Sequence, residues 1–192
     1  MQTTPEIEAF WETFKAAAGV THNEYVVVSF GDTPAMEDNL AALVGRGTKR
    51  ATASLLRDYV GGDEPMPRVG DLALVVDGSR APCCIYRITR VDVTPLSAVD
   101  ERFAWDEGEG DRTLAWWMDA HHAFFRRQAA REDFLFHDEI EVSSSDSRLC
   151  GRRRSRIASL RHHDALKRRR LSRPEPISMG ALNTDIYASS RP

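Results

Sequence analysis

A lysine and two hydroxyl side chains lie close together in the sequence, directly after a glycine-containing turn. Residues 48–55 alternate in polarity and carry threonines, which is typical of a strand or an extended edge. In such a segment Thr52 and Ser54 point to one face, and Lys49 lies near the start. A lysine whose pKa is lowered by burial can act as a base, and a neighbouring hydroxyl can then become a nucleophile. This pattern suggests hydrolysis; the alternative is a solvated strand end with ordinary β residues.

An acidic segment, DEGEGD at residues 106–111, is the second candidate. Two glycines alternate with Glu107 and Glu109, which suggests a backbone constrained near a ligand. The alternative is a flexible segment whose acids favour the positive end of the helix that follows. The residues alone leave both interpretations open.

The helix predicted over residues 113–127 concentrates aromatic and histidine side chains. His121 and His122 are interpreted as core residues, because no carboxylate lies at a metal-ligand offset on this helix. The aromatic side chains recur at helical spacing and are interpreted as core rather than as base-stacking platforms: Trp116, Trp117, Phe124 and Phe125. Arg57 and Tyr59 follow the lysine segment and are candidates to contact a base or a phosphate, with a plain surface role as the alternative.

The elements that must position these residues follow from hydrophobic periodicity and turn signals. Antiparallel strands are expected in the middle of the chain. Helices are expected at residues 5–18, 35–44, 95–104 and 113–127, and strands at 25–30, 48–55, 72–76, 83–93 and from 139 to 142.

Composition bounds the class of protein. The 192 residues suffice for one domain with a core, and 42% apolar residues exclude collagen-like and wholly disordered chains. The net charge of −3 is a cancellation, because residues 1–142 hold 14 basic and 25 acidic side chains whereas the last 50 hold 12 and 4. Three cysteines, two of them adjacent, favour a reducing compartment. Without a leader or a membrane span, a cytoplasmic protein is expected.

From residue 25 to residue 142 the chain resembles the ASCH (activating signal cointegrator homology) domain family, in its longer bacterial subtype. The resemblance is carried in one collinear order by residues 47–59, 67–78, 88–125 and 136–142. It implies an α+β fold: a PUA-like, mixed or antiparallel β-barrel with flanking helices. The expected organisation is an N-terminal helical extension (1–24), the ASCH domain (25–142) and a basic Arg/Ser-rich tail without regular structure (143–192).

The resemblance also implies a site. The family pattern G-x-K-x-x-T falls on Gly47, Lys49 and Thr52. In amidohydrolase-like members the lysine, the threonine and a glutamate from the acidic segment form the catalytic set. Lys49 would then be the activating base, Thr52 the nucleophile, and Glu109 or Glu107 the residue that orients the lysine, with Glu109 favoured. Arg50 stands where many members have threonine, at the pocket rim; the expected substrate-binding residues are Arg50, Ser54 and Tyr59.

Three functions remain open. The leading one is binding of RNA or a modified nucleoside, with amidohydrolase action on acylated cytidine. The second is a non-catalytic RNA-binding module in which Lys49 and Arg50 contact phosphate. The third is a ribonuclease in which Glu107, Glu109 and Asp111 hold a divalent metal through oxygen ligands. No cofactor is expected apart from that metal, and the acidic body opposes RNA as a partner more than it opposes a small nucleoside.

The last 50 residues depart from the family. Members of this subtype usually have a last barrel strand of the kind V-F-E-R-F-R, where this chain has Ser-Ser-Asp-Ser at residues 144–147. The codons TTC GAG CGA TTC, shifted by one nucleotide, encode those four residues, so the tail is interpreted as a frame-shifted translation. The alternative is a functional arm in which residues 152–156 and 167–170 neutralise phosphates. If the frame is genuine, the barrel is expected to lack its closing strand and to expose an edge.

Overall fold

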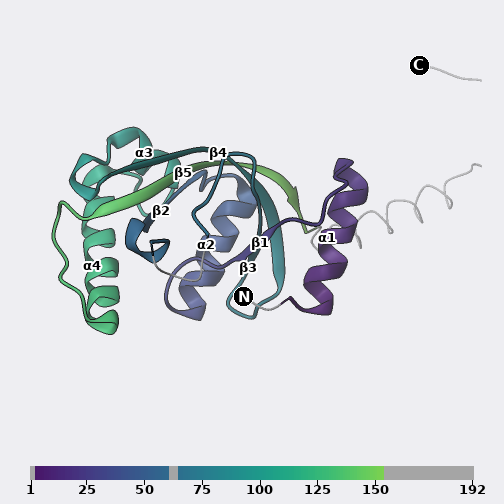
Figure 1. The fold of residues 1–192 in the computed structure, drawn as a ribbon, viewed down its shortest axis with the longest axis horizontal. Coiled ribbons are helices and arrows are strands. Elements are labelled where there is room, and N and C mark those ends of the chain that lie inside the picture. Colours follow the sequence, from purple (N-terminus) through teal and green to yellow (C-terminus); the bar gives the residue numbers. More distant parts are fainter. Residues whose placement is uncertain (1–2, 61–64, 154–192) are drawn as a thin grey trace, which may run out of the picture. The chain divides into compact units, whose positions relative to one another are not determined.

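A computed structural model of the chain describes residues 3–60 and 65–153. These residues form an α+β fold in which a curled five-stranded sheet makes half of a barrel, with four helices around it (Figure 1). The strand order is β1-β3-β4-β5-β2, with β1 parallel to β3 and every other neighbouring pair antiparallel. The α+β, PUA-like architecture predicted from the sequence is confirmed. Strands β1 and β2 are the two edges of the half-barrel.

The helices and strands have the following bounds. The helices are α1 (Pro5–Ala18), α2 (Pro34–Arg46), α3 (Glu101–Glu107) and α4 (Leu114–Glu132), with short 3-10 turns at Leu56–Asp58 and Leu96–Ala98. The strands are β1 (Val26–Val28), β2 (Ala51–Leu55), β3 (Leu72–Val76), β4 (Pro82–Pro95) and β5 (Glu141–Arg152).

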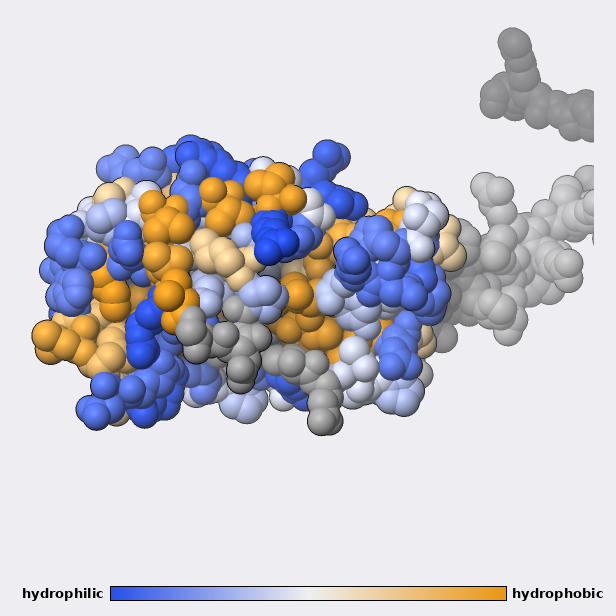
Figure 2. Space-filling model, viewed as in Figure 1, coloured by the Kyte–Doolittle hydropathy of each residue, from blue (hydrophilic) through white to orange (hydrophobic). Residues whose placement is uncertain are grey.

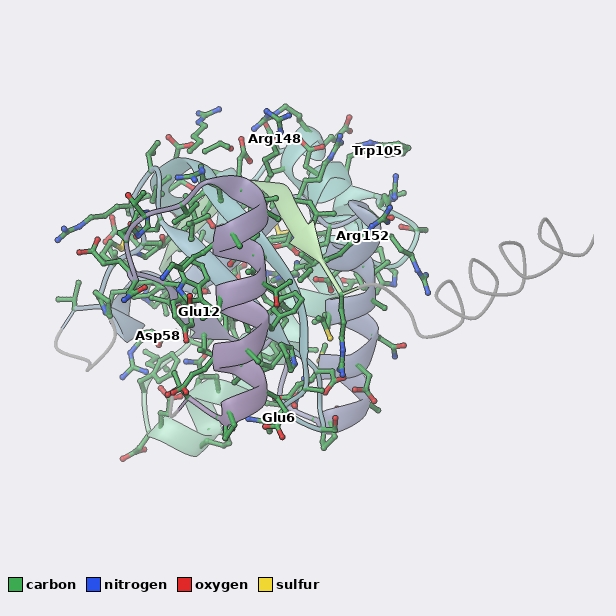
Figure 3. The ribbon with its side chains drawn as sticks, turned by 90° about the vertical axis from the view of Figure 1, so that its right-hand side faces the viewer. Glu6, Glu12, Asp58, Trp105, Arg148 and Arg152 are labelled. Carbon is green, nitrogen blue, oxygen red and sulfur yellow. The ribbon has the colours of Figure 1, made fainter. Side chains whose placement is uncertain are left out.

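Strand β3 organises the core because both of its faces are buried. Leu72, Leu74 and Val76 pack with α1, whereas Ala73 and Val75 pack with α2 on the other face. Helix α1 lies across the strands, with Glu6 and Glu12 on it (Figure 3). Helix α4 covers the opposite end of the sheet (Figure 1), where it packs against β2.

The predicted helix at residues 95–104 is instead split. A 3-10 turn ends at Ala98, and the side chain of Asp100 accepts a hydrogen bond from the N–H of Phe103, which starts α3 afresh. Helix α3 then continues through Glu107, so the first two residues of the predicted acidic loop belong to its last turn. This helical turn fixes the direction of the Glu107 side chain.

The prediction that the chain has no regular structure from Ser143 onward is wrong for residues 143–152. Strand β5 continues to Arg152 and pairs with β4 on one side and β2 on the other, so the expected missing strand is present. A strand paired on both sides gains a ladder of backbone hydrogen bonds whatever its side chains are, and the small Ser143 and Ser145 are buried in it. The basic segments 154–156 and 167–170 lie outside the described residues.

Candidate functional site

The turn between α2 and β2 buries Lys49. Gly47 ends α2 in the left-handed conformation (φ 76°), and the N–H of Lys49 donates to the carbonyl of Leu43 at 3.2 Å. The next N–H, that of Arg50, donates to the carbonyl of Asp106 at 2.7 Å and ties the start of β2 to α3. Lys49 is consequently only 4% exposed, so it is not a solvated strand end.

Two glutamates meet this lysine, one in the last turn of α3 and one just after the helix ends. Lys49 Nζ lies 2.6 Å from Glu109 Oε1 and 3.3 Å from Glu107 Oε2. Gly108 between them has φ 72°, and a Cβ there would lie 2.4 Å from the carbonyl oxygen of Thr48. The close approach of two backbones therefore accounts for this glycine without a ligand. A Cβ on Gly110 would overlap the indole ring of a tryptophan in α4.

His121 on α4 is the fourth member of this group, and the sequence interpretation of His121 as an ordinary core residue missed it. Its Nε2 lies 3.4 Å from Glu107 Oε2, its Nδ1 lies 3.0 Å from the carbonyl oxygen of Trp117, and its ring stacks on that indole at 3.8 Å. Lys49, Glu107, Glu109 and His121 are called the Lys49 cluster below. No sequence signal links His121 to Glu107, because only the crossing of α3 and α4 brings them together.

The charges of the cluster determine its protonation. Burial lowers the pKa of Lys49, but the neighbouring Glu107 and Glu109 raise it further, and the net direction is upward. Burial likewise raises the pKa of Glu107, yet Lys49 and His121 outweigh it and bring the pKa to about 2. Lys49 is thus an ammonium at rest, the opposite of the lowered pKa that the sequence analysis required of a lysine base.

A cavity of about 580 Å³ opens between the two edges of the half-barrel. All five strands contribute to its wall, through Val27, Thr52, Ala73, Tyr86 and Ser145 among others. We call it the strand cavity. Three of the predicted site residues line it, namely Thr52, Ser54 and Tyr59. Ser145, which the sequence analysis did not select, lies opposite Thr52 in the β2–β5 register and lines it as well.

A second cavity of about 280 Å³ lies against α2 and α4. We call it the helix cavity. Glu109 and His121 line it among mostly apolar side chains such as Leu40 and Phe124. The two cavities share a partition, since Thr52 and Ser54 face the strand cavity while Ala53 between them faces the helix cavity. Likewise, Phe30 lines the strand cavity and Gly31 lines the helix cavity. Lys49 Nζ lies 5.6 Å from the centroid of the Phe30 ring.

The predicted catalytic set is therefore only partly assembled. Lys49, Glu107 and Glu109 are in contact, whereas Thr52 and Glu109 line different cavities. The predicted metal ligands are not gathered: the two glutamates face Lys49, and the side chain of Asp111 instead accepts hydrogen bonds from Thr113. Within residues 3–60 and 65–153, no group of three potential ligands could hold a metal ion.

The two remaining candidates, Arg50 and Arg57, lie on the surface. Arg50 is more than half exposed and pairs with Asp106, and Arg57 pairs with Glu132 at 2.7 Å. Trp105 is 53% exposed and points away from the body of the molecule (Figure 3), with the guanidinium of Arg112 over its ring. Hydrophobic surface is interspersed with hydrophilic surface on the face shown in Figure 2. In the described part of the chain, no helix is long and apolar enough to cross a membrane.

Fold and site together define a PUA-like half-barrel domain with a cavity at its open edge and a buried charge cluster beside it. The family model of the ASCH domain matches residues 26–147. The chain belongs to the ASCH domain family.

Two solved structures are similar to it. An ASCH domain from Lactobacillus crispatus is 29% identical with a TM-score of 0.72, over 79% of this chain and 98% of that one. A protein from Enterococcus faecalis is 30% identical with a TM-score of 0.71, over 77% of this chain and 89% of that one. No curated protein matches the chain.

Proposed function

We propose that this ASCH domain protein binds a modified nucleoside in the strand cavity and hydrolyses an acyl group from it. The observation that carries the proposal is the strand cavity itself, with hydroxyl side chains on one wall and a buried lysine–glutamate pair behind it. Its volume of about 580 Å³ lies within the range of ordinary small-molecule sites.

The wall of the strand cavity has the chemistry that recognises a nucleobase. Thr52, Ser54 and Ser145 supply hydroxyls, each able to donate and accept a hydrogen bond. The rings of Phe30 and Tyr86 line the same cavity and offer faces on which a base can stack. Free nucleoside is favoured over a long RNA because the body of the protein is acidic, and an acidic field opposes a chain of phosphates.

The hydrolytic step assigns Thr52 as the nucleophile. Because Lys49 is charged at rest, it first passes a proton to Glu109 across their 2.6 Å contact once substrate has excluded water. The neutral amine then accepts the proton of the Thr52 hydroxyl as its oxygen attacks the acyl carbonyl. Lys49 returns that proton to the departing amino nitrogen of the base as the C–N bond breaks. Lys49 then accepts a proton from a water molecule as the water oxygen attacks the acyl–threonine ester, and it passes that proton to the departing Thr52 oxygen, which releases the free acid. Glu109 finally returns its proton to the lysine as the cluster is restored.

The two alternative functions become outcomes of the same experiment. A non-catalytic module would bind RNA without turnover, through exposed groups such as Arg50. A metal-assisted ribonuclease is disfavoured because Glu107 and Glu109 already face the Lys49 ammonium. Occupying them with a metal would require Lys49 to leave.

The test incubates the full chain with acetylated cytidine and with single-stranded RNA, each with and without chelator. Release of acetate that is insensitive to chelator, abolished by Thr52→Val and Lys49→Ala, supports the proposal. Thr89→Val is the matched control, because Thr89 is an exposed threonine on strand β4. Chelator-sensitive cleavage of RNA supports the ribonuclease, and binding of RNA without turnover supports the module. Turnover unchanged in Lys49→Ala would overturn the site.

A further inference from the structure

The Lys49 cluster contains two carboxylates but only one lysine. Lys49 carries one positive charge, Glu107 and Glu109 carry two negative charges, and their side chains are 3%, 0% and 11% exposed. An unbalanced charge in such a place is costly, since a buried ion is stabilised only by partners that satisfy it. A fourth, positively charged group in contact with one of the carboxylates would balance the cluster.

The hydrogen-bond geometry of His121 identifies that group. Its Nδ1 lies 3.0 Å from the carbonyl oxygen of Trp117, which only accepts hydrogen bonds, so Nδ1 carries a proton. Its Nε2 lies 3.4 Å from Glu107 Oε2. In a neutral ring with the proton on Nδ1, the lone pair of Nε2 would face a carboxylate, and the two would repel. The contact is favourable only when Nε2 is protonated too.

We propose that His121 is an imidazolium that brings the Lys49 cluster to zero net charge. By sharing the charge of Glu107, it leaves Glu109 as the closer partner of Lys49, at 2.6 Å against 3.3 Å for Glu107. His121 is thereby a positioning residue for the lysine–glutamate pair. This second part rests on the proposed function, whereas the charge state of the ring does not.

The surroundings of His121 bear on this charge state from each neighbouring element. The charged groups beside His121 are Glu107 at the end of α3, Glu109 just after it and Lys49 before β2. Arg127 lines the same helix cavity but pairs with Asp32, which neutralises it. The α2 side chains in the cavity, such as Leu40, carry no charge. The other neighbours of the ring are uncharged: the indole of Trp117 stacks on it, and the Phe125 ring lies edge-on to it.

The direct test is a two-bond proton–nitrogen NMR spectrum of the histidine rings in the full chain at about pH 7. The His121 signals are assigned by their loss in His121→Gln. Both ring nitrogens of His121 are expected at the shifts of a protonated imidazolium. A spectrum of the neutral ring, with one bare nitrogen, would overturn the inference even if the protein hydrolyses its substrate.

A compensation experiment tests the charge balance through unfolding by urea. His121→Gln is expected to lower the urea midpoint, and adding Glu107→Gln to it is expected to restore most of the loss, because the double variant is balanced again. His122→Gln is the matched control, since His122 on the same helix faces the 64% exposed side chain of Asp138. Additive losses in the double variant would contradict the charge balance.

Activity measurements test whether His121 positions the lysine–glutamate pair. With the substrate of the proposed reaction, His121→Gln is expected to lower kcat at least tenfold with KM little changed, because His121 contacts Glu107 beside the lysine–glutamate pair and does not line the strand cavity. The double variant is expected to recover part of that kcat. A change confined to KM would contradict the positioning role. If the wild-type protein has no turnover, the proposed function fails while the NMR result still decides the charge state.

Discussion

Strand β2 separates two regions of opposite character. Toward the strand cavity it presents the hydroxyls of Thr52 and Ser54, whereas toward α3 and α4 it presents small apolar side chains beside the buried charges of the Lys49 cluster. Lys49 lies in the turn before β2, where its N–H donates to the carbonyl of Leu43, and Thr52 follows it in the strand. A single sequence pattern thus supplies both sides of a partition: a contribution to stability is expected on the charged side, and ligand binding is expected on the hydroxyl side.

The largest effect is expected from removing the lysine. Lys49→Met leaves Glu107 and Glu109 buried without their cation, and breaking a buried pair in this way costs about 3–5 kcal/mol. Urea unfolding followed by circular dichroism measures the loss. Lys15→Met is the control, because Lys15 pairs with the exposed Glu12 and such pairs contribute at most about 1 kcal/mol. Equal losses in the two variants would show that the cluster has no special role in stability.

Lowering the pH is also expected to reduce stability through the Lys49 cluster. The pKa of Glu107 is about 2 in the folded protein against an ordinary value of 4.5, so the carboxylate stabilises the fold above pH 4.5 and this contribution is lost as the pH falls toward 2. The shift corresponds to roughly 3 kcal/mol. Urea unfolding from pH 7 to pH 3 should show the decline.

Glu107→Gln provides the control for the acid effect. The variant cannot titrate at this position, so its stability should fall less steeply over the same pH range. A residual slope is expected from Asp32, whose pKa is lowered by the hydrogen bond from Arg127. Identical slopes in variant and wild type would mean that Glu107 does not titrate as proposed.

A smaller loss of stability is expected from substituting Gly108, the residue between Glu107 and Glu109. Gly108→Ala places a Cβ at φ 72° and 2.4 Å from the carbonyl oxygen of Thr48, at a cost of about 1–3 kcal/mol. Gly19→Ala is a matched control, because Gly19 has φ 67° with nothing within 4 Å of its Cβ. The difference between their urea midpoints isolates the backbone contact that brings the carboxylates to Lys49. Equal midpoints would mean that the backbone around Gly108 shifts to accommodate the Cβ without a cost in stability.

Much of the fold could be predicted from the sequence because its patterns are local. The apolar spacing of Ile7, Trp11 and Phe14 predicted α1, and the turn before Pro82 predicted the hairpin of β3 and β4. Strand β5 could not be predicted beyond Val142, because its serines carry no apolar alternation. The pairing with β2 and β4 stabilises it there, and pairing partners are distant in sequence.

The candidate site was predictable to a smaller extent. Resemblance selected Lys49 and both glutamates, and the structure brings these three together. The charge state of Lys49 was predicted in the wrong direction, because it depends on two carboxylates some sixty residues away in sequence. His121 and Ser145 were missed for the same reason: each joins the site through tertiary or cross-strand contacts that periodicity does not reveal.

The smallest effect on stability is expected on the hydroxyl side of the partition. Ser54→Ala removes one hydroxyl from the wall of the strand cavity, where solvent can replace its hydrogen bonds, so unfolding should change by less than about 0.5 kcal/mol. Nucleoside binding should weaken roughly two- to tenfold, the equivalent of one hydrogen bond. Isothermal titration with acetylated cytidine measures this, with Ser97→Ala, an exposed serine bonded to Glu139, as control. Loss of stability without loss of binding would reverse the division of roles between the two faces of β2, because the hydroxyl side would then be structural.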